Sequence, residues 1–164
     1  MPGEILSIDY DKGTCSVQPY ALLKIVTGDK LQYPVINDVP IVVPQSSVRD
    51  ACIAFPIVPG DTCLLIVSEG TLDYWRYNRV TELDAKFSLS NAVCIPGLTR
   101  KFDPCFKEAA EDGAVILKYG AGKFKLTDTT MTISAQNLVL EAGNNLTLSA
   151  GNNVTVSGSR VDIN

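Results

Sequence analysis

The last third of the chain, residues 115–163, alternates apolar and polar positions in short units. Each unit is a pair of apolar side chains separated by one residue, and successive pairs begin between seven and nine residues apart. The pairs are Val115/Leu117, Phe124/Leu126, Met131/Ile133, Leu138/Leu140, Leu146/Leu148, Val154/Val156 and Val161/Ile163. This alternation is typical of short strands with one buried face, so the pattern predicts an internal repeat of strands.

Two consecutive eight-residue copies, 142–149 and 150–157, show the unit most clearly, because both begin Ala-Gly-Asn-Asn. Gly and Asn tolerate the positive φ of tight turns, so Gly143, Asn144, Gly151 and Asn152 predict turns between strands. Two apolar side chains per repeat make a face too narrow to enclose a core within one chain. We therefore predict an intertwined trimeric β-helix over residues 114–164, in which copies of the chain bury these pairs around a common axis.

The side chains predicted to form the trimer core are Phe124, Leu126, Met131, Ile133, Leu138, Leu140, Leu146, Leu148, Val154 and Val156. The residues between them, such as Thr147 and Thr155, are predicted to face solvent. A single-chain β-solenoid is disfavoured because its coils need about 20 or more residues per turn. A calcium-binding nonapeptide repeat is rejected because this segment has Asn where that motif has carboxylates.

Residues 1–98 show a different pattern, with short apolar strands and turn signals about every ten residues. Strands are predicted at 5–10 and 14–19 around a turn at 11–13, and at 31–36, 39–44, 52–56 and 62–67. Residues 62–67 are almost all apolar, which predicts the most buried strand of the domain. Five or six such strands favour a small closed barrel of the oligonucleotide/oligosaccharide-binding (OB) type.

The predicted fold class is therefore all-β. It has an N-terminal OB-fold collar at 1–98, a polar connector at 99–113 with one helical turn near 107–111, and a C-terminal spike at 114–164. An aromatic cluster, Tyr74, Trp75 and Tyr77, follows the strand at 62–67. Because few basic residues lie nearby, a role in an interface or in the core is favoured over stacking of bases or sugars.

Composition narrows the function. The 164 residues are 46% hydrophobic and 20% charged, which is a globular composition. The net charge of −4 argues against nucleic acid as the partner. The absence of His removes the usual general base and the commonest metal ligand. No apolar run reaches the about 20 residues that a membrane-spanning helix needs.

The remaining candidates for chemistry are cysteines and carboxylates. The five cysteines show no metal-binding spacing and are predicted to be buried thiols of a protein made in a reducing cytosol. They are Cys15, Cys52, Cys63, Cys94 and Cys105. Asp112, Asp128, Glu141 and Asp162 are too spread out for glycoside hydrolysis, which needs a facing pair. We predict no metal site, no cofactor and no enzymatic activity.

Several short motifs occur in the order found in a known family. They are Asn-Asp-Val-Pro-Ile-Val-Val-Pro at 37–44, Phe-Pro-Ile-Val-Pro-Gly-Asp-Thr-Cys-Leu-Leu at 55–65, and Phe-Ser-Leu-Ser-Asn-Ala-Val-Cys-Ile-Pro-Gly-Leu at 87–98. Ser68, Glu69, Asp73, Trp75 and Asp84 lie between them. Over residues 1–98 the chain resembles the N-terminal domain of the central baseplate spikes of contractile-tailed bacteriophages, which are cell-puncturing proteins.

The resemblance implies a homotrimer with an OB-fold collar, a β-helix and a pointed C-terminal apex. It implies a place in the virion at the tail baseplate, under the tail tube and its hub proteins, after synthesis in the host cytoplasm. It also implies that sheath contraction drives the spike mechanically through the host outer membrane.

One feature departs from the family pattern. Several relatives end in a His-x-His motif that holds an iron ion, whereas residues 158–164 here are Gly-Ser-Arg-Val-Asp-Ile-Asn. The predicted apex residues are Arg160, Val161, Asp162, Ile163 and Asn164. Either these residues finish the tip, or a separate protein caps it; the sequence does not identify a tip or axial ion.

Two other functions stay open. The chain could be an OB-fold module that binds a glycan or nucleic acid, with the repeat as its stalk. It could also be the equivalent spike of a tailocin or of a secretion device.

Overall fold

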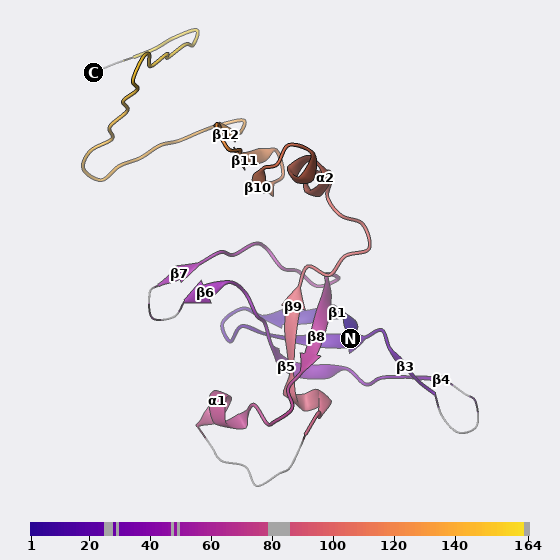
Figure 1. Cartoon of the computed structure of the whole chain (residues 1–164). Coiled ribbons are helices and arrows are strands. Elements are labelled where there is room, and N and C mark those ends of the chain that lie inside the picture. The colour runs from indigo at the N-terminus through magenta and orange to yellow at the C-terminus, as the bar shows by residue number, and fades with distance from the viewer. Residues whose placement is uncertain (25–27, 29, 47, 49, 79–85, 163–164) are drawn as a thin grey trace. The chain divides into compact units, whose positions relative to one another are not determined.

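The computed structural model describes residues 1–24, 28, 30–46, 48, 50–78 and 86–162. Strands far outnumber helices in this part of the chain, in agreement with the predicted all-β class. The chain divides into two compact units, Met1–Phe102 and Asp103–Asn164 (Figure 1). The predicted connector at 99–113 is thus shared between the two units.

The first unit is built on a five-stranded antiparallel sheet. Its strands are β1 (Pro2–Asp9), β2 (Thr14–Pro19), β5 (Ile36–Pro40), β8 (Thr62–Val67) and β9 (Ala92–Pro96). Their order across the sheet is β5-β2-β1-β8-β9. The predicted first hairpin is confirmed, because β1 pairs with β2 around a turn that contains Gly13 with a positive φ of 64°.

Alternate side chains of this sheet form the core of the first unit. The buried hydrophobic residues are Ile5, Cys15, Val17, Ile36, Val39, Ile57, Cys63, Leu65, Ala92 and Cys94. Gly3 on β1 lies over Val17, where an added Cβ would be 2.6 Å from the Val17 Cγ1 atom. A side chain at this position would therefore push β1 and β2 apart.

The closed barrel that we predicted is not found among the described residues. The outer strands β5 and β9 approach each other, but in the described part of the chain a single bridge joins these edges, between Ile41, just after β5, and Cys94 on β9. There the backbone N–H of Val42 donates to the carbonyl oxygen of Cys94 over 2.8 Å. Pro40 and Pro44 flank this bridge and have no N–H to donate, so they limit the length of any ladder between the two edges.

The prediction that residues 62–67 form the most buried strand is wrong. On β8, Leu65 is 1% exposed but its neighbour Ile66 is 46% exposed. β2 is more buried, with Cys15, Val17 and Pro19 all inside. The reason is that β8 belongs to an antiparallel sheet with one solvent face, and such a strand buries only every second residue.

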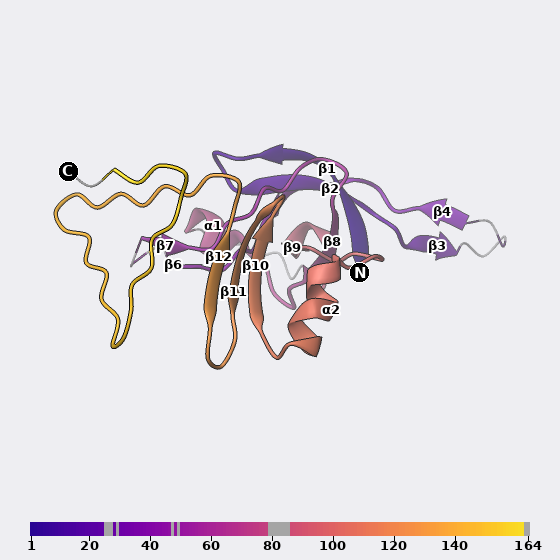
Figure 2. The same ribbon diagram turned by 90° about the horizontal axis from the view of Figure 1, so that it is seen from above.

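Two small hairpins replace the strands predicted at 31–36 and 52–56. One pairs β3 (Leu22–Lys24) with β4 (Lys30–Gln32), and the other pairs β6 (Gln45–Ser46) with β7 (Ala51–Cys52). They extend from opposite sides of the five-stranded sheet (Figures 1 and 2). After β8 come a short helix, α1 (Asp73–Tyr77), and a 3-10 turn, η1 (Leu89–Asn91).

The second unit begins with a helix, α2 (Pro104–Glu111), which is longer than the single predicted turn. The Asp103 side chain caps its N-terminus by accepting a hydrogen bond from the Cys105 backbone N–H over 2.8 Å. A three-stranded antiparallel sheet follows, made of β10 (Val115–Tyr119), β11 (Gly122–Leu126) and β12 (Met131–Ser134). No described helix of the chain combines the length and apolar character that crossing a membrane requires.

The predicted β-helix is not found in the described residues of the single chain. Residues 135–162 contain no assigned strand, although they bend at 136–137, 143–144, 151–152 and 159. The bends at 143–144 and 151–152 fall on the Gly-Asn pairs where turns were predicted. The physical reason for the missing strands is that a strand is defined by pairing, and these segments pair with nothing within one chain.

Candidate functional site

The two faces of the β10–β12 sheet differ sharply. Leu117 lies opposite Phe124, and Phe124 lies opposite Ile133. Residues directly opposite each other in antiparallel strands point to the same side, so one side collects nearly all the apolar residues. We define the apolar face by its six members, which are Val115, Leu117, Phe124, Leu126, Met131 and Ile133.

The apolar face is uncovered in the single chain. Val115 and Met131 are both 62% exposed, and Leu117, Leu126 and Ile133 are also exposed. Phe124, in the middle strand, is half-buried. A contiguous apolar patch across three strands is unusual for a monomer and is typical of an interaction site. Four of its members are predicted trimer-core residues.

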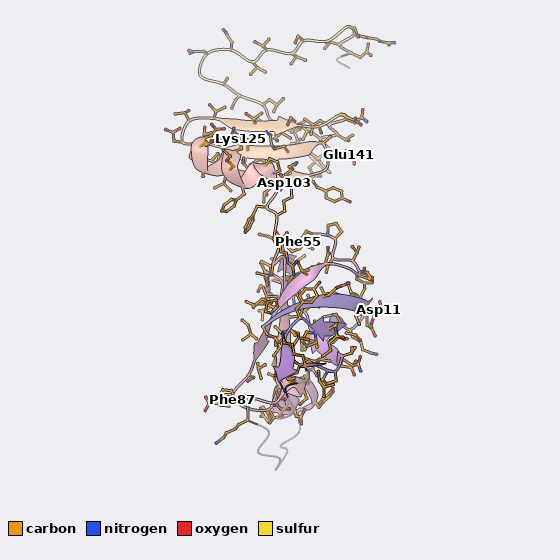
Figure 3. All side chains as sticks on the ribbon, turned by 90° about the vertical axis from the view of Figure 1, so that its right-hand side faces the viewer. Asp11, Phe55, Phe87, Asp103, Lys125 and Glu141 are labelled. Atoms are coloured by element: carbon orange, nitrogen blue, oxygen red, sulfur yellow. The ribbon has the colours of Figure 1, made fainter. Side chains whose placement is uncertain are left out.

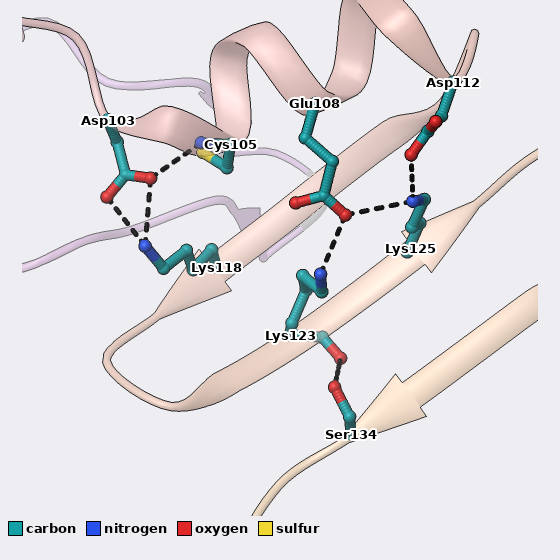
Figure 4. A network of polar contacts seen from close by, with 8 residues as sticks. All are labelled: Asp103, Cys105, Glu108, Asp112, Lys118, Lys123, Lys125 and Ser134. Atoms are coloured by element: carbon teal, nitrogen blue, oxygen red, sulfur yellow. Dashed lines mark hydrogen bonds and ion pairs between the residues drawn. The ribbon is translucent and has the colours of Figure 1, made fainter.

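Ion pairs hold helix α2 against the other face of this sheet, and we call this set of ion pairs the clamp. The Glu108 carboxylate accepts hydrogen bonds from the Nζ atoms of Lys123, at 2.8 Å, and Lys125, at 2.9 Å (Figure 4). The Lys125 ammonium also pairs with Asp112 at the end of the helix. Lys123 and Lys125 lie on the face opposite Phe124, so the helix covers the polar face and leaves the apolar face open.

The first turn of α2 is held by a second ion pair. The Lys118 Nζ atom lies 2.9 and 2.8 Å from the two Asp103 carboxylate oxygens. The hydrogen bond from Lys118 is the main reason that the pKa of Asp103 falls to about 2. The same kind of bond, first from Lys123, lowers the pKa of Glu108. Three basic strand residues thus match three acidic residues on or beside the helix.

The apolar pairs of the repeat that follow β12 are exposed, like the apolar face. The predicted trimer-core residues beyond β12 are all exposed, and the single chain does not bring them together. They are Leu138, Leu140, Leu146, Leu148, Val154 and Val156. Glu141 marks this extended region in Figure 3. Each apolar pair therefore lacks a covering surface in the described part of the chain.

The predicted apex is described only in part. The Arg160 Nε atom donates to the Asp162 carboxylate, with distances of 3.0 and 2.8 Å to its two oxygens. Both side chains are exposed, and so is Val161. Ile163 and Asn164 lie outside the described residues.

The aromatic cluster on α1 is on the surface of the first unit. Trp75 is 71% exposed, and Tyr74 and Tyr77 are also exposed. The Arg76 guanidinium between them donates to the backbone carbonyl of Asp38, which anchors the helix on β5. A role in the core of the single chain is therefore excluded, whereas a role in an interface stays a prediction.

The cysteines divide into two groups. Cys15, Cys63 and Cys94 are buried as predicted, but Cys52 is exposed on β7 and Cys105 is half-buried. A hydrogen bond with Cys15 raises the pKa of Cys94 to about 12. Among the described residues, no group of three or more His, Cys, Asp or Glu side chains is placed to hold a metal ion.

Sequence reasoning missed the clamp between α2 and the sheet, although the signals are present. Asp103 followed by Pro104 is a helix start, because Asp is a strong N-cap and Pro suits the first helical position. Lys123 and Lys125 are two residues apart on a strand and so share a face. Only the folded unit places that face under the carboxylates of α2.

The comparison with protein families gives one result. The sequence matches the family described as Phage protein Gp138 N-terminal domain over residues 1–97, which is more than half of the chain. No curated protein matches the sequence. The match covers the five-stranded sheet and ends before the unit that carries the apolar face.

Proposed function

The chain belongs to the Gp138 N-terminal domain family of phage proteins, and from this premise we propose that it is the central spike of a contractile tail. In this proposal three copies form one spike at the baseplate, beneath the tail tube and its hub proteins. Contraction of the sheath drives the spike through the host outer membrane. Family membership supports the broader role of a structural component of a phage virion.

The uncovered apolar face is the observation that carries this proposal. The face continues into exposed apolar pairs as far as Val161, and the segments that bear them have no strand partners within the chain. A partner must supply both strand edges and apolar surface at the same repeat. A second and a third copy of the same chain do so, because they carry the same pairs at the same spacing.

Three copies around one axis would bury every pair centrally and pair every open edge. The helix α2 would then lie on the outside, since it covers the polar face of each sheet. An interlocked shaft of this kind has no edge from which to peel, so its resistance to unfolding is a kinetic one. It transmits axial force and opens a bilayer without catalysis.

The collar and the apex have separate roles in this proposal. The first unit, with its own core, docks on the tail tube or hub. The exposed Arg160 and Asp162 pair lies next to the leading end of the shaft, which these residues finish themselves or a separate protein caps. Neither role requires a cofactor.

Light scattering of the purified full-length chain tests the assembly. The expected mass is three times 17.7 kDa. The trimer should survive unheated in sodium dodecyl sulfate and separate only after boiling, because dissociation requires many strand pairings to break together. A folded chain with the mass of a single copy would overturn the proposal.

Immunogold electron microscopy of the phage that encodes the chain tests its place. Antibodies raised against the purified protein should label the tip of the tail. Label confined to the capsid, or intact virions that contain none of the protein, would contradict a baseplate spike.

A further inference from the structure

The first unit carries two structures that its own core does not use. These are the β3–β4 hairpin and the β6–β7 hairpin, which extend from opposite sides of the sheet (Figure 2). An isolated two-stranded hairpin is marginally stable in water. Each hairpin is therefore expected to rest on a surface, and no described side chain of the β3–β4 hairpin belongs to the buried core of the first unit.

The β3–β4 hairpin exposes apolar side chains. Leu22 on β3 is 56% exposed and lies directly opposite Gln32, while Leu31 on β4 is 54% exposed. Tyr20, just before the hairpin, is also exposed. Such side chains on a protruding hairpin indicate an arm that another surface covers.

A groove of matching character lies at the base of the β6–β7 hairpin. It has a volume of about 520 Å³ and is lined mainly by apolar groups, among them Tyr10, Ile41, Val43, Phe55 and Ile57. The Tyr10 hydroxyl donates to the Ile57 carbonyl oxygen over 2.8 Å, which braces one wall against the β1–β2 hairpin. Ile41 and Val43 are half-buried in the groove, and Phe55 is exposed at its edge.

The charges of the hairpin and the groove are complementary. Lys30 is exposed on β4. Asp11 is exposed in the β1–β2 turn, between the groove residues Tyr10 and Gly13. The neighbouring Lys12 is paired with Asp9 over 3.0 Å, so the charge at this rim that is available to a partner is negative.

We propose that, in the trimer, the β3–β4 hairpin of each copy lies in the groove beside the β6–β7 hairpin of the next copy. This inference rests on the proposed trimeric spike and assigns the contact between its collars. In a threefold ring each contact joins two different surfaces, and the ring closes only if those surfaces lie on different sides of the subunit. The two hairpins satisfy that condition.

Chemical cross-linking of the full-length chain tests the contact. The background carries Cys52→Ser and Cys105→Ser, which removes the exposed and half-buried thiols. Leu31→Cys is then combined with Phe55→Cys, which places one thiol on the hairpin and one in the groove. A short bismaleimide should convert most chains to covalent dimers and trimers on a denaturing gel, whereas each single variant should stay uncross-linked.

A control pair and a charge swap sharpen the test. Leu31→Cys with Trp75→Cys joins two exposed positions, but α1 lies apart from both hairpins, so this pair should not cross-link (Figure 1). In the Leu31→Cys/Phe55→Cys protein, Lys30→Glu or Asp11→Lys should slow cross-linking several-fold. The two changes together should restore the rate.

Light scattering of the same variants separates the two proposals. If the Leu31→Cys/Phe55→Cys protein is a trimer but cross-links no faster and no more completely than the Leu31→Cys/Trp75→Cys control, the hairpin contact is overturned. The proposed trimeric spike is not affected by that result. Such a trimer would keep the groove available to a tail protein. A folded single chain overturns both the contact and the spike.

Discussion

Both units contain strands that alternate apolar and polar residues, but with opposite results. Every buried hydrophobic residue in the described part of the chain lies in Met1–Phe102, and the sheet of Asp103–Asn164 buries none. In the first unit the sheet curls until Ile41 meets Cys94, so its inner side chains cover one another. In the second unit α2 covers the polar face and the apolar face stays open.

This difference shows that an alternation of apolar and polar residues identifies the apolar face of a strand. It does not identify what covers that face. Val17 in β2 and Leu148 in the repeat both occupy apolar positions of alternating segments. Val17 is fully buried, whereas Leu148 is 64% exposed. If the proposed trimer is correct, the first unit is stable as one chain and the second only as three.

The largest expected effect comes from a charge on the apolar side of the repeat. Leu148→Asp should reduce the mass in solution from three chains to one, because three unpaired carboxylates would meet at the axis and each would cost several kcal/mol. Thr147→Asp is the matched control, since its side chain should face solvent. Light scattering of both proteins checks the prediction. Equal masses for the two variants would show that the faces are assigned incorrectly.

A core change in the first unit should destabilise without dissociating. Leu65→Ala should lower the free energy of unfolding of this unit by about 2–5 kcal/mol, because it leaves a cavity under the sheet. Ile66→Ala, one residue along and 46% exposed, should cost less than about 1 kcal/mol. Urea unfolding followed by circular dichroism measures both. A similar cost for both would mean that β8 has no single inner face.

A smaller loss is expected at Gly3. The Cβ atom of Gly3→Ala would lie 2.6 Å from the Val17 Cγ1 atom, and the resulting strain should cost about 1–3 kcal/mol. Gly70→Ala is the control, because an added Cβ there meets no atom within 4 Å. Thermal unfolding of the two variants compares them. An unchanged melting temperature for Gly3→Ala would show that β1 and β2 can separate without loss.

The smallest effect concerns the clamp of α2. The Lys118 hydrogen bond holds the pKa of Asp103 at about 2, below its ordinary 3.8. A lowered carboxyl pKa stabilises the folded state above pH 3.8, and that contribution is lost as the pH falls through about 2. Lys118→Met should therefore raise the pKa of Asp103 and shift acid unfolding of the second unit to higher pH.

Carboxyl-carbon NMR titration of Asp103 measures the shift directly. Lys107→Met is the control, because Lys107 pairs with Glu111 at 3.4 Å on the exposed side of the same helix. It should leave the Asp103 titration unchanged. If Lys118→Met leaves the Asp103 titration unchanged, the ion pair between Asp103 and Lys118 does not help to hold α2 against the sheet.

Features that depend on residues close together in the sequence were predicted more accurately than features that depend on distant residues. The β1–β2 hairpin was predicted well, because its turn and both strands lie within a few residues of one another. The bends at Gly143–Asn144 and Gly151–Asn152 were predicted for the same reason. The burial of residues 62–67 was predicted less well, because it depends on which face of β8 packs into the core of the folded unit.

The candidate site shows the same limit. The apolar pairs could be read directly from their spacing, and three of them, Val115/Leu117, Phe124/Leu126 and Met131/Ile133, lie on one face as expected. The pairing of Lys123 and Lys125 with Glu108 could not be predicted from the sequence. No local pattern shows which face of the sheet the helix will cover. The exposure of Cys52 likewise followed from the short β6–β7 hairpin, which a run of apolar residues at 52–55 did not indicate.

By itself the sequence determined the strand periodicity, the change of pattern between the two units and the apolar side of the repeat. These are properties of neighbouring residues, fixed by the alternation of side chains along extended backbone. Tertiary structure alone decided that the first unit closes over its own core, that Ile41 and Cys94 join its edges at one point, and that α2 covers the polar face of the second unit. Each of these depends on contacts between different elements of the fold, where packing and ion pairing outweigh local preference.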